Sequence, residues 1–244
     1  MDFKSFVRKA LVFLHLDLTK NLKYDRLTLS IMKEVISDNS NCMDVGCHKG
    51  EILDVILSLS KNGQHFGFEP IPLLYKQLKQ NYEHKAHIYP YALSDINGKT
   101  SFNWVKNASA YSGIKKRKYE VKNPSIEEIE IEVRTADNII PEGIKIDFIK
   151  IDVEGGEFGV LKGAERILTK SHPYVIFECG IGASDYYGTD PAALYQYITK
   201  NVGLSLSTLS SFVHKRRALT QDEFELNYNS NKEYYFIAYP KENG

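Results

Sequence analysis

Short apolar runs that suit buried strands alternate along the chain with segments whose apolar side chains recur at helical spacing. The runs are bounded by glycine, proline or polar residues, and the segments between them follow the three- to four-residue period of amphipathic helices. The predicted strands are 42–45, 64–69, 87–92, 146–151 and 174–178, and the predicted helices are 52–59, 73–82 and 158–168. Because parallel strands are joined through helices, this alternation predicts an α/β fold with a doubly wound sheet.

Two stretches interrupt the alternation. An Asn-Gly pair at 97–98 separates the strand-like runs 89–93 and 100–105, and because that dipeptide favours tight reversals, the sequence predicts a hairpin there. Residues 106–128 are polar, lack a period and include four consecutive basic side chains, which predicts an inserted loop with a solvated or anion-binding charge run. Residues 129–133 then alternate like a half-exposed strand.

Two further strands, 204–209 and 234–239, are predicted near the end of the sequence. No long helix is predicted between them, so we expect an antiparallel pair at one edge of the sheet. The predicted fold class is therefore α/β, with a seven-stranded, mostly parallel, doubly wound sheet and one antiparallel strand near an edge.

The first forty residues are predicted to form a helical extension in front of a domain spanning 41–244 that carries the inserted loop. Apolar side chains near the start follow helical spacing and predict a lid or packing helix, with contact to a membrane surface as the alternative. These side chains are Phe3, Phe6, Val7, Ala10, Leu11 and Leu14. No apolar run approaches the roughly 20 residues of a membrane-spanning helix.

Charge and cysteine content narrow the class of protein. The 244 residues include 31 Lys+Arg and 31 Asp+Glu, a formal net charge of +0, whereas a protein that binds nucleic acid through its phosphates needs a basic excess. We therefore expect no nucleic-acid partner. Cys42, Cys47 and Cys179 form neither a disulfide framework nor a zinc motif, which favours reduced thiols and a cytoplasmic location.

Candidate chemistry lies where the predicted strands end, because ligands of open α/β sheets bind at the carboxyl ends of the strands. The first strand leads into a glycine turn, which precedes a helix start that offers free N–H groups. The turn lacks both the three-glycine pattern of dinucleotide-binding folds and the Lys-Ser/Thr pair of phosphate-binding loops. Its residues include Asp44, Gly46, Cys47, His48 and Gly50.

The next two strands end in further polar groups. Glu69 and Pro70 close the second strand about 20 residues after the glycine turn, where a carboxylate can accept two hydrogen bonds from a ribose diol. The third strand is followed by Leu93, Ser94 and Asp95, which are predicted to form another wall of the same pocket. These loops predict a nucleoside pocket. Its acidic neighbours would repel phosphates, so the pocket suits the cationic cofactor S-adenosylmethionine.

The fourth strand leads into the densest group of acids, KIDVEGGE at 150–157. Asp152 and Glu154 lie where this strand gives way to a glycine turn, near the expected position of the methyl group. Such a carboxylate pair can take a proton from a hydroxyl, orient a sugar, bind a divalent cation or cap the following helix. Glu178, which ends the fifth strand, is expected in the same cleft.

Together these motifs resemble the FkbM family of S-adenosylmethionine-dependent methyltransferases. The resemblance covers residues 41–180 and rests on MDVGCHKG at 43–50, FGFEP at 66–70, YALSDINGKTSF at 91–102, DFIKIDVEGGEFGVLKGAERIL at 147–168 and VIFECG at 175–180. The family commonly carries a small residue and then Asn where this chain has Cys47 and His48.

The resemblance implies a Rossmann-like class I methyltransferase fold with the methionine portion of the cofactor at the glycine turn, the ribose at Glu69 and the adenine at 93–95. Asp152 and Glu154 are the candidate catalytic residues, facing cofactor and acceptor. The predicted cofactor-binding residues are Asp44, Gly46, Cys47, His48, Gly50, Glu69, Pro70, Leu93, Ser94, Asp95 and Asp152.

We therefore expect methyl transfer to an oxygen of a small-molecule or glycan acceptor, with a sugar hydroxyl favoured. One alternative within the enzyme class is a magnesium-assisted reaction, with Asp152, Glu154 and Glu178 as oxygen ligands. Another is a catalytically idle binding or scaffold domain that kept the fold. A nicotinamide-dependent reductase requires a third glycine in the turn, which this chain lacks.

Overall fold

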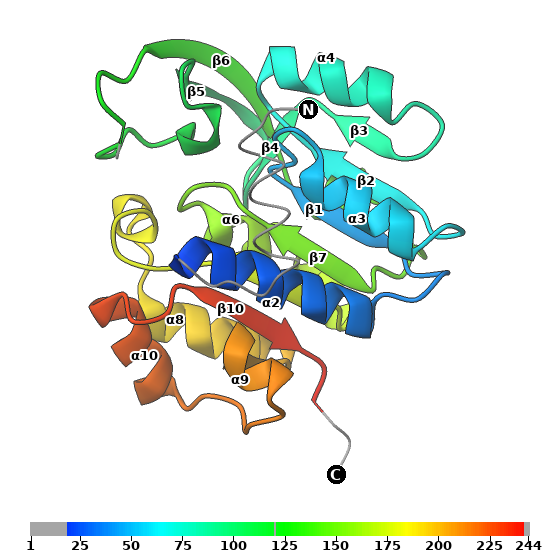
Figure 1. Ribbon diagram of the computed structural model, residues 1–244, viewed down its shortest axis with the longest axis vertical. Coiled ribbons are helices and arrows are strands. Elements are labelled where there is room, and N and C mark those ends of the chain that lie inside the picture. Colours follow the sequence, from blue (N-terminus) through cyan, green and yellow to red (C-terminus); the bar gives the residue numbers. More distant parts are fainter. Residues whose placement is uncertain (1–18, 120, 242–244) are drawn as a thin grey trace.

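The computed structural model of the protein describes residues 19–119 and 121–241, so the helix predicted around 3–14 lies outside the described residues. Seven strands form one sheet in the order β3-β2-β1-β7-β8-β10-β9, and β10 runs antiparallel to both of its neighbours (Figure 1). The predicted seven-stranded, mostly parallel sheet is confirmed. In sheet order the strands are β3 (His87–Tyr89), β2 (His65–Phe68), β1 (Cys42–Val45), β7 (Phe148–Ile151), β8 (Tyr174–Glu178), β10 (Tyr235–Tyr239) and β9 (Ser205–Thr208).

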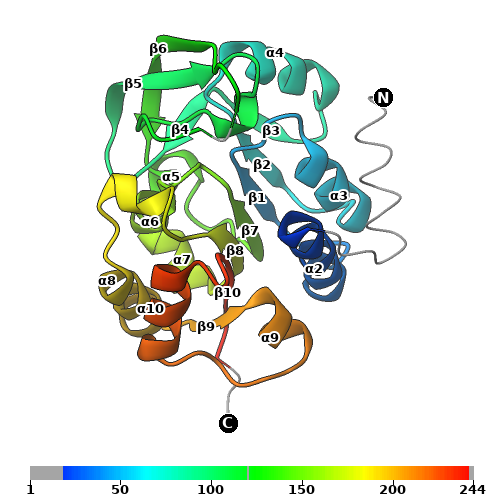
Figure 2. The ribbon, with the colours of Figure 1, turned by 60° about the vertical axis from the view of Figure 1, so that its left-hand side comes forward.

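Helices cover both faces of the sheet, which forms the middle layer in Figure 2. One face carries α2 (Lys20–Val35), α3 (Glu51–Leu59), α4 (Pro72–Asn81) and α9 (Leu209–Val213). The other carries α5 (Ala136–Ile139), α6 (Glu157–Lys162), α7 (Glu165–Ser171), α8 (Pro191–Gln196), the π-helical turn η3 (Tyr197–Val202) and α10 (Gln221–Ser230). Because parallel strands need both faces covered, this arrangement explains why β1, β2 and β7 are buried along their whole length.

Alternation along the strands divides the core between the two faces. Met43 and Val45 of β1 pack with α6 and α7, whereas Cys42 packs with α2. Since side chains of a strand alternate between faces, the polar Asp44 of β1 and its register partner Lys150 of β7 point towards the face that carries α2. Two buried charged residues therefore interrupt the apolar core at the carboxyl ends of neighbouring strands.

A second, three-stranded sheet shows that the predicted hairpin is wrong. Its order is β4 (Tyr91–Leu93), β6 (Ile126–Arg134) and β5 (Gly98–Val105), so β6 lies between the two runs that flank the Asn-Gly pair. The reason is length: β5 pairs with β6 over its full eight residues, which outweighs a short local turn. The predicted strand 87–92 is also divided, because Pro90 has no N–H to continue a ladder.

Two helix predictions also need correction. The expected absence of a long helix between the last two strands is wrong, because α10 runs for ten residues after the N-cap Thr220, which forms a capping box with Glu223. The antiparallel pairing of β9 and β10 is confirmed. The helix predicted at 158–168 is two helices, and a Cβ at the intervening Gly163 would lie 2.0 Å from the Ser94 carbonyl oxygen.

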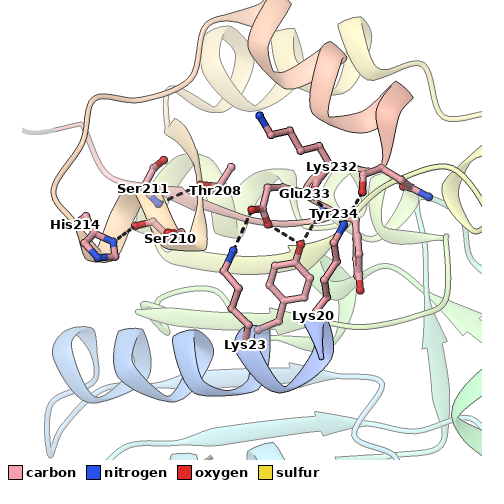
Figure 3. A network of polar contacts seen from close by, with 11 residues as sticks. Lys20, Lys23, Thr208, Ser210, Ser211, His214, Lys232, Glu233 and Tyr234 are labelled. Carbon is pink, nitrogen blue, oxygen red and sulfur yellow. Dashed lines mark hydrogen bonds and ion pairs between the residues drawn. The ribbon is translucent and has the colours of Figure 1, made fainter. Parts of the chain in front are cut away.

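Polar contacts hold α2 against the residues that precede β10 (Figure 3). The Tyr24 hydroxyl donates to Oε2 of Glu233 at 2.6 Å, and Lys23 Nζ donates to Oε1 at 3.1 Å. The Tyr234 hydroxyl donates to Oδ1 of Asn21 at 2.8 Å. Between 19 and 241, leaving out residue 120, no helix is long and apolar enough to cross a membrane. The division of the chain at residue 40 stays a prediction.

Candidate functional site

A cavity of about 410 Å³ lies at the carboxyl ends of the parallel strands. Its lower part is formed by the loops after β1, β2 and β4, here called the glycine-turn wall (46–50, 69–71 and 93–95). Its upper part is lined by Ser109, Ala110, Ser112 and Ile114. The segment 109–118 between β5 and β6, which contains these residues and begins with the short 3-10 helix η1 (Ser109–Tyr111), is here called the roof. The predicted site residues that line the cavity are Gly46, His48, Glu69, Pro70, Leu93, Ser94, Asp95, Asp152 and Glu154.

Gly46 brings the loops after β1 and β7 together. Its φ is +85°, and a Cβ there would lie 2.0 Å from the backbone oxygen of Asp152. The N–H groups of Gly46 and Cys47 both donate to the Phe68 carbonyl at 3.0 Å, which joins this turn to β2. Only glycine suits this conformation and this close approach.

Gly50 and Cys47 have structural surroundings and do not line the cavity. Gly50 precedes α3 at φ +84°, and the Tyr82 hydroxyl donates to its carbonyl at 3.0 Å. The buried Cys47 thiol donates to the Asp44 carbonyl at 3.1 Å. These two residues therefore hold the turn from behind.

Glu69 joins two loops of the glycine-turn wall. Its Oε2 accepts from the His48 N–H at 2.8 Å and its Oε1 accepts from the Ile71 N–H at 2.9 Å. Burial raises the pKa of this carboxyl to about 7, although both hydrogen bonds favour the ionised form. Each oxygen keeps a free lone pair at the cavity wall, so the carboxylate is able to accept both hydroxyls of a diol.

Asp44 lies behind the glycine turn and outside the lining of the cavity. Its carboxyl is buried, and Oδ2 has no hydrogen-bond partner among the described residues. Burial raises the pKa of Asp44 to about 7, even though Lys150 acts in the opposite direction. An unpartnered acceptor next to the turn fits a positively charged ligand group better than an anionic one.

Ser94 and Asp95 are held by α6. Lys162 pairs with Oδ2 of Asp95, and this hydrogen bond lowers the pKa of the Asp95 carboxyl. A Cβ at Gly159 would lie 2.7 Å from the Ser94 hydroxyl, so the glycine lets α6 approach the loop. Four apolar residues also line the cavity, namely Phe68, Ile71, Ala92 and Phe102.

Asp152 is held as an ionised carboxylate. Its Oδ2 accepts from Lys150 Nζ at 3.0 Å and from the Tyr235 hydroxyl at 2.9 Å. Burial opposes ionisation, but the Lys150 ammonium and these hydrogen bonds together lower the pKa of Asp152. A carboxylate with a lowered pKa is a weak base, so the geometry suits Asp152 to orienting a ligand group more than to taking a proton.

Glu154 connects the loop after β7 to the roof. It has a φ of +61°, which is unusual for a residue other than glycine, and its Oε2 accepts from the guanidinium of Arg117. The Arg117 side chain is only 9% exposed and lies over the ring of Tyr111 at 5.7 Å from its centroid. Arg117 belongs to the basic run, so that run is not simply a solvated surface.

Two more contacts fix the roof. Nε2 of His48 lies 2.8 Å from the Ser109 hydroxyl, and the Lys115 N–H donates to the Tyr187 hydroxyl at 3.1 Å. Burial and the neighbouring Lys49 lower the pKa of His48, so its imidazole is neutral near pH 7. His48 therefore uses its backbone for the glycine-turn wall and its side chain for the roof.

Two further carboxyls lie beneath Asp152. Oε1 of Glu157 accepts from the N–H groups of Val153 and Gly155, both at 3.1 Å, while burial raises the pKa of this carboxyl to about 7. Burial and repulsion from Asp152 raise the pKa of Glu178 to about 8. Within 19–119 and 121–241, no group of three or more His, Cys, Asp or Glu side chains is arranged to hold a metal ion.

Several residues of the site escaped the sequence patterns. Arg117 was visible only as part of a charge run, and Lys150 only as part of the strand motif KIDVEG. Tyr187 and Tyr235 lie in segments without a motif, and their contacts span 72 and 83 positions of the sequence. Such pairings depend on the packing of the whole domain.

Comparison with known proteins identifies the family of this chain and proteins with a similar fold. The model of the methyltransferase FkbM domain matches residues 44–206. A solved methyltransferase FkbM from Methylobacillus flagellatus is similar over 84% of this chain and 44% of its own, with a TM-score of 0.52 and 19% identity. A precorrin-6y C5,15-methyltransferase from Geobacter metallireducens aligns with 75% of this chain and 72% of its own, at a TM-score of 0.41 and 12% identity. No curated protein gives a significant match.

The relation to the Methylobacillus structure concerns the fold alone. This chain spans less than half of that structure's length, 44%. The order of the seven strands, with one antiparallel strand next to the edge, is that of class I methyltransferases.

Proposed function

The chain belongs to the FkbM methyltransferase family. On that premise we propose that it transfers the methyl group of S-adenosylmethionine to a hydroxyl oxygen. The favoured acceptor is a sugar hydroxyl of a glycan or a glycosylated metabolite. Membership of a methyltransferase family implies use of this donor. The observation that carries the proposal is Glu69, a buried carboxylate with one free lone pair on each oxygen at the wall of a nucleoside-sized cavity.

Residues in and beside the glycine-turn wall fit the donor in three places. Glu69 offers two acceptors to the ribose diol. The apolar lining that includes Phe68 and Phe102 suits a base, with Asp95 in the same lining. Asp44 lies behind the turn and outside the lining, where its ionised form adds negative potential that favours a positively charged methionine end.

The bound donor supplies an activated methyl group on a positively charged sulfur, whose C–S bond breaks as the new C–O bond forms. The chain has to place the acceptor oxygen in line with that bond and keep water out. Asp152 and Glu154 line the cavity between the glycine-turn wall and the roof, which supports their role in orienting the acceptor hydroxyl. The lowered pKa of Asp152 argues that the proton of the hydroxyl goes to another group or to water.

Titration calorimetry with S-adenosylmethionine tests the cofactor assignment. We expect the Glu69→Ala variant to bind at least tenfold more weakly, because two ribose hydrogen bonds are lost. Glu142→Ala is the matched control, since Glu142 is an exposed glutamate in the loop before the amino end of β7. Equal affinity of wild type and Glu69→Ala contradicts the ribose assignment.

Methyl transfer itself is tested with donor labelled in the methyl group and a carbohydrate extract as acceptor. Asp152→Asn and Glu154→Gln should reduce label transfer more than they reduce cofactor affinity, as expected of groups that act on the acceptor. A protein that binds the donor but transfers no label to any hydroxyl compound is instead a binding domain with this fold. Equal losses in transfer and affinity assign both carboxylates to cofactor binding or folding.

A further inference from the structure

The basic run of the roof is pinned along the rim of the cavity. Ile114 lines the cavity, the Lys115 N–H donates to the Tyr187 hydroxyl, and Arg117 donates to Glu154. Asn103 of β5 anchors the base of this segment, because its side-chain amide donates to the Ile114 carbonyl at 3.1 Å. The four basic side chains at 115–118 are therefore held beside the entrance to the site.

Their charge is only partly balanced. Lys115, Lys116 and Lys118 are exposed, and none of their ammonium groups has a side-chain partner among the described residues. Glu154 is paired with Arg117, and the nearby exposed Asp185 accepts from the Gly182 N–H. The three lysine ammonium groups therefore add positive charge beside the cavity that no described side chain pairs with, in a chain whose overall net charge is zero.

Arg117 holds the basic run in place and adds no free charge at the entrance. Its side chain is only 9% exposed, and its planar guanidinium already has two partners. In Arg117 one nitrogen donates to Glu154, and another lies 3.5 Å from the Gly182 carbonyl oxygen. Aromatic rings lie close by, with Tyr111 beneath the guanidinium and Tyr187 in the lining of the cavity. A ring with an apolar face and a hydroxyl tip suits a sugar, which also has apolar and polar sides.

We propose that the acceptor is an anionic saccharide, whose carboxylate or phosphate binds the basic run 115–118 while its hydroxyl reaches the cavity between Asp152 and Glu154. The inference rests on the proposed methyl transfer and adds the substrate class to it. Fixed positive charge at the rim attracts such an acceptor and increases its local concentration at the site. Salt should weaken this attraction, because exposed charges are screened.

Three probes that differ only at C6 test the charge requirement: methyl glucoside, its 6-carboxylate and its 6-phosphate. Ligand-observed NMR titration in the presence of S-adenosylhomocysteine measures their affinities. The wild-type protein should bind both anionic probes at least tenfold more tightly than the neutral sugar. A clear preference between the 6-carboxylate and the 6-phosphate identifies which oxyanion the rim recognises.

Two triple variants locate the effect. In K115Q/K116Q/K118Q, which leaves Arg117 in place, affinity for the anionic probes should fall at least tenfold, with less than a twofold change for the neutral sugar. The matched control is K61Q/K170Q/K200Q, which removes three exposed lysines from the segments that lead into the amino ends of β2, β8 and β9. The control should keep the affinity of the wild type.

The proposal is overturned if neutral and anionic probes bind alike, or if both triple variants lose affinity equally. It is also overturned if neither anionic probe binds at 10 mM, a concentration that is roughly at the weak end of specific binding. Calorimetry with S-adenosylmethionine separates this failure from failure of the proposed function. A protein that binds the donor but shows no charge preference contradicts only the substrate class. A protein that prefers anionic sugars but does not bind the donor contradicts the methyl transfer.

Discussion

The glycine-turn wall and the roof close the same cavity but are built in different ways. The wall is held by backbone hydrogen bonds between the ends of adjacent parallel strands, such as those from the N–H groups of Gly46 and Cys47 to the Phe68 carbonyl. The roof is held by side chains that meet across long sequence separations, such as Arg117 with Glu154 and Tyr187 with the Lys115 N–H. The wall is therefore fixed by the strand order, whereas the roof depends on a few individual contacts.

This difference assigns different physical roles to the two regions. A wall fixed by the sheet is preorganised, so it loses little entropy when it binds a ligand of constant shape. A roof held by a few individual polar contacts opens at lower cost than the sheet, because fewer contacts have to break. We infer that the wall recognises the donor shared by the family and that the roof varies with the acceptor.

The most damaging change to the wall is Gly46→Ala. The new Cβ would lie 2.0 Å from the Asp152 oxygen at φ +85°, so β1 and β7 must move apart. We expect a loss of about 4 kcal/mol or more in the free energy of unfolding, measured by urea denaturation. In Gly143→Ala, φ is +93° but no atom lies within 4 Å, so only the conformational cost of about 1–2 kcal/mol applies. Equal losses in the two variants contradict the close approach.

The corresponding change in the roof, Arg117→Ala, should cost less. It leaves the Glu154 carboxylate, 20% exposed, without its partner, and we expect about 2 kcal/mol of destabilisation. The double variant R117A/E154A removes both charges and should recover about half of that loss. Affinity for S-adenosylmethionine should stay within twofold in both variants. A large fall in donor affinity contradicts the separation of roof and wall.

The same contrast explains what the sequence could predict. Repeated strand and helix patterns identified the parallel strands, and the loop motifs that follow them identified Glu69 and Asp152, since neighbouring strands bring these loops together. The hairpin at 97–98 was wrong because β6, nearly thirty residues later, pairs with β5 over a longer length. Arg117 and Tyr235 were missed because their partners are chosen by tertiary packing, for which the local pattern carries no signal.

The pH dependence of ligand affinity provides a finer test of the wall. Burial raises the pKa of Glu69 to about 7, so the carboxyl is mostly protonated at pH 6 and mostly ionised at pH 8. A diol donates its hydrogen bonds to the ionised form, and affinity should therefore fall up to about tenfold between pH 8 and pH 6. Calorimetry with S-adenosylhomocysteine, which lacks the sulfonium charge, measures this dependence.

Glu69→Gln isolates the contribution of this carboxyl, because Asp44 and Glu157 also have pKa values raised to about 7 by burial. The variant should bind more weakly at pH 8 but lose most of the difference between pH 8 and pH 6. If the wild type and the Gln variant show parallel pH profiles, the titrating group is another carboxyl and Glu69 does not receive the ribose in its ionised form.

The smallest effect is expected at the one residue that belongs to both regions. His48→Asn keeps the N–H that donates to Glu69, and Asn tolerates the φ of +49° better than most residues, so donor affinity should change less than threefold. The variant loses the contact between Nε2 and Ser109, and we expect faster tryptic cleavage of the roof at its lysines with less than about 1 kcal/mol of global destabilisation. His48→Ala, which adds conformational strain, should be less stable than His48→Asn. If His48→Asn lowers donor affinity strongly while cleavage of the roof is unchanged, the imidazole belongs to the wall.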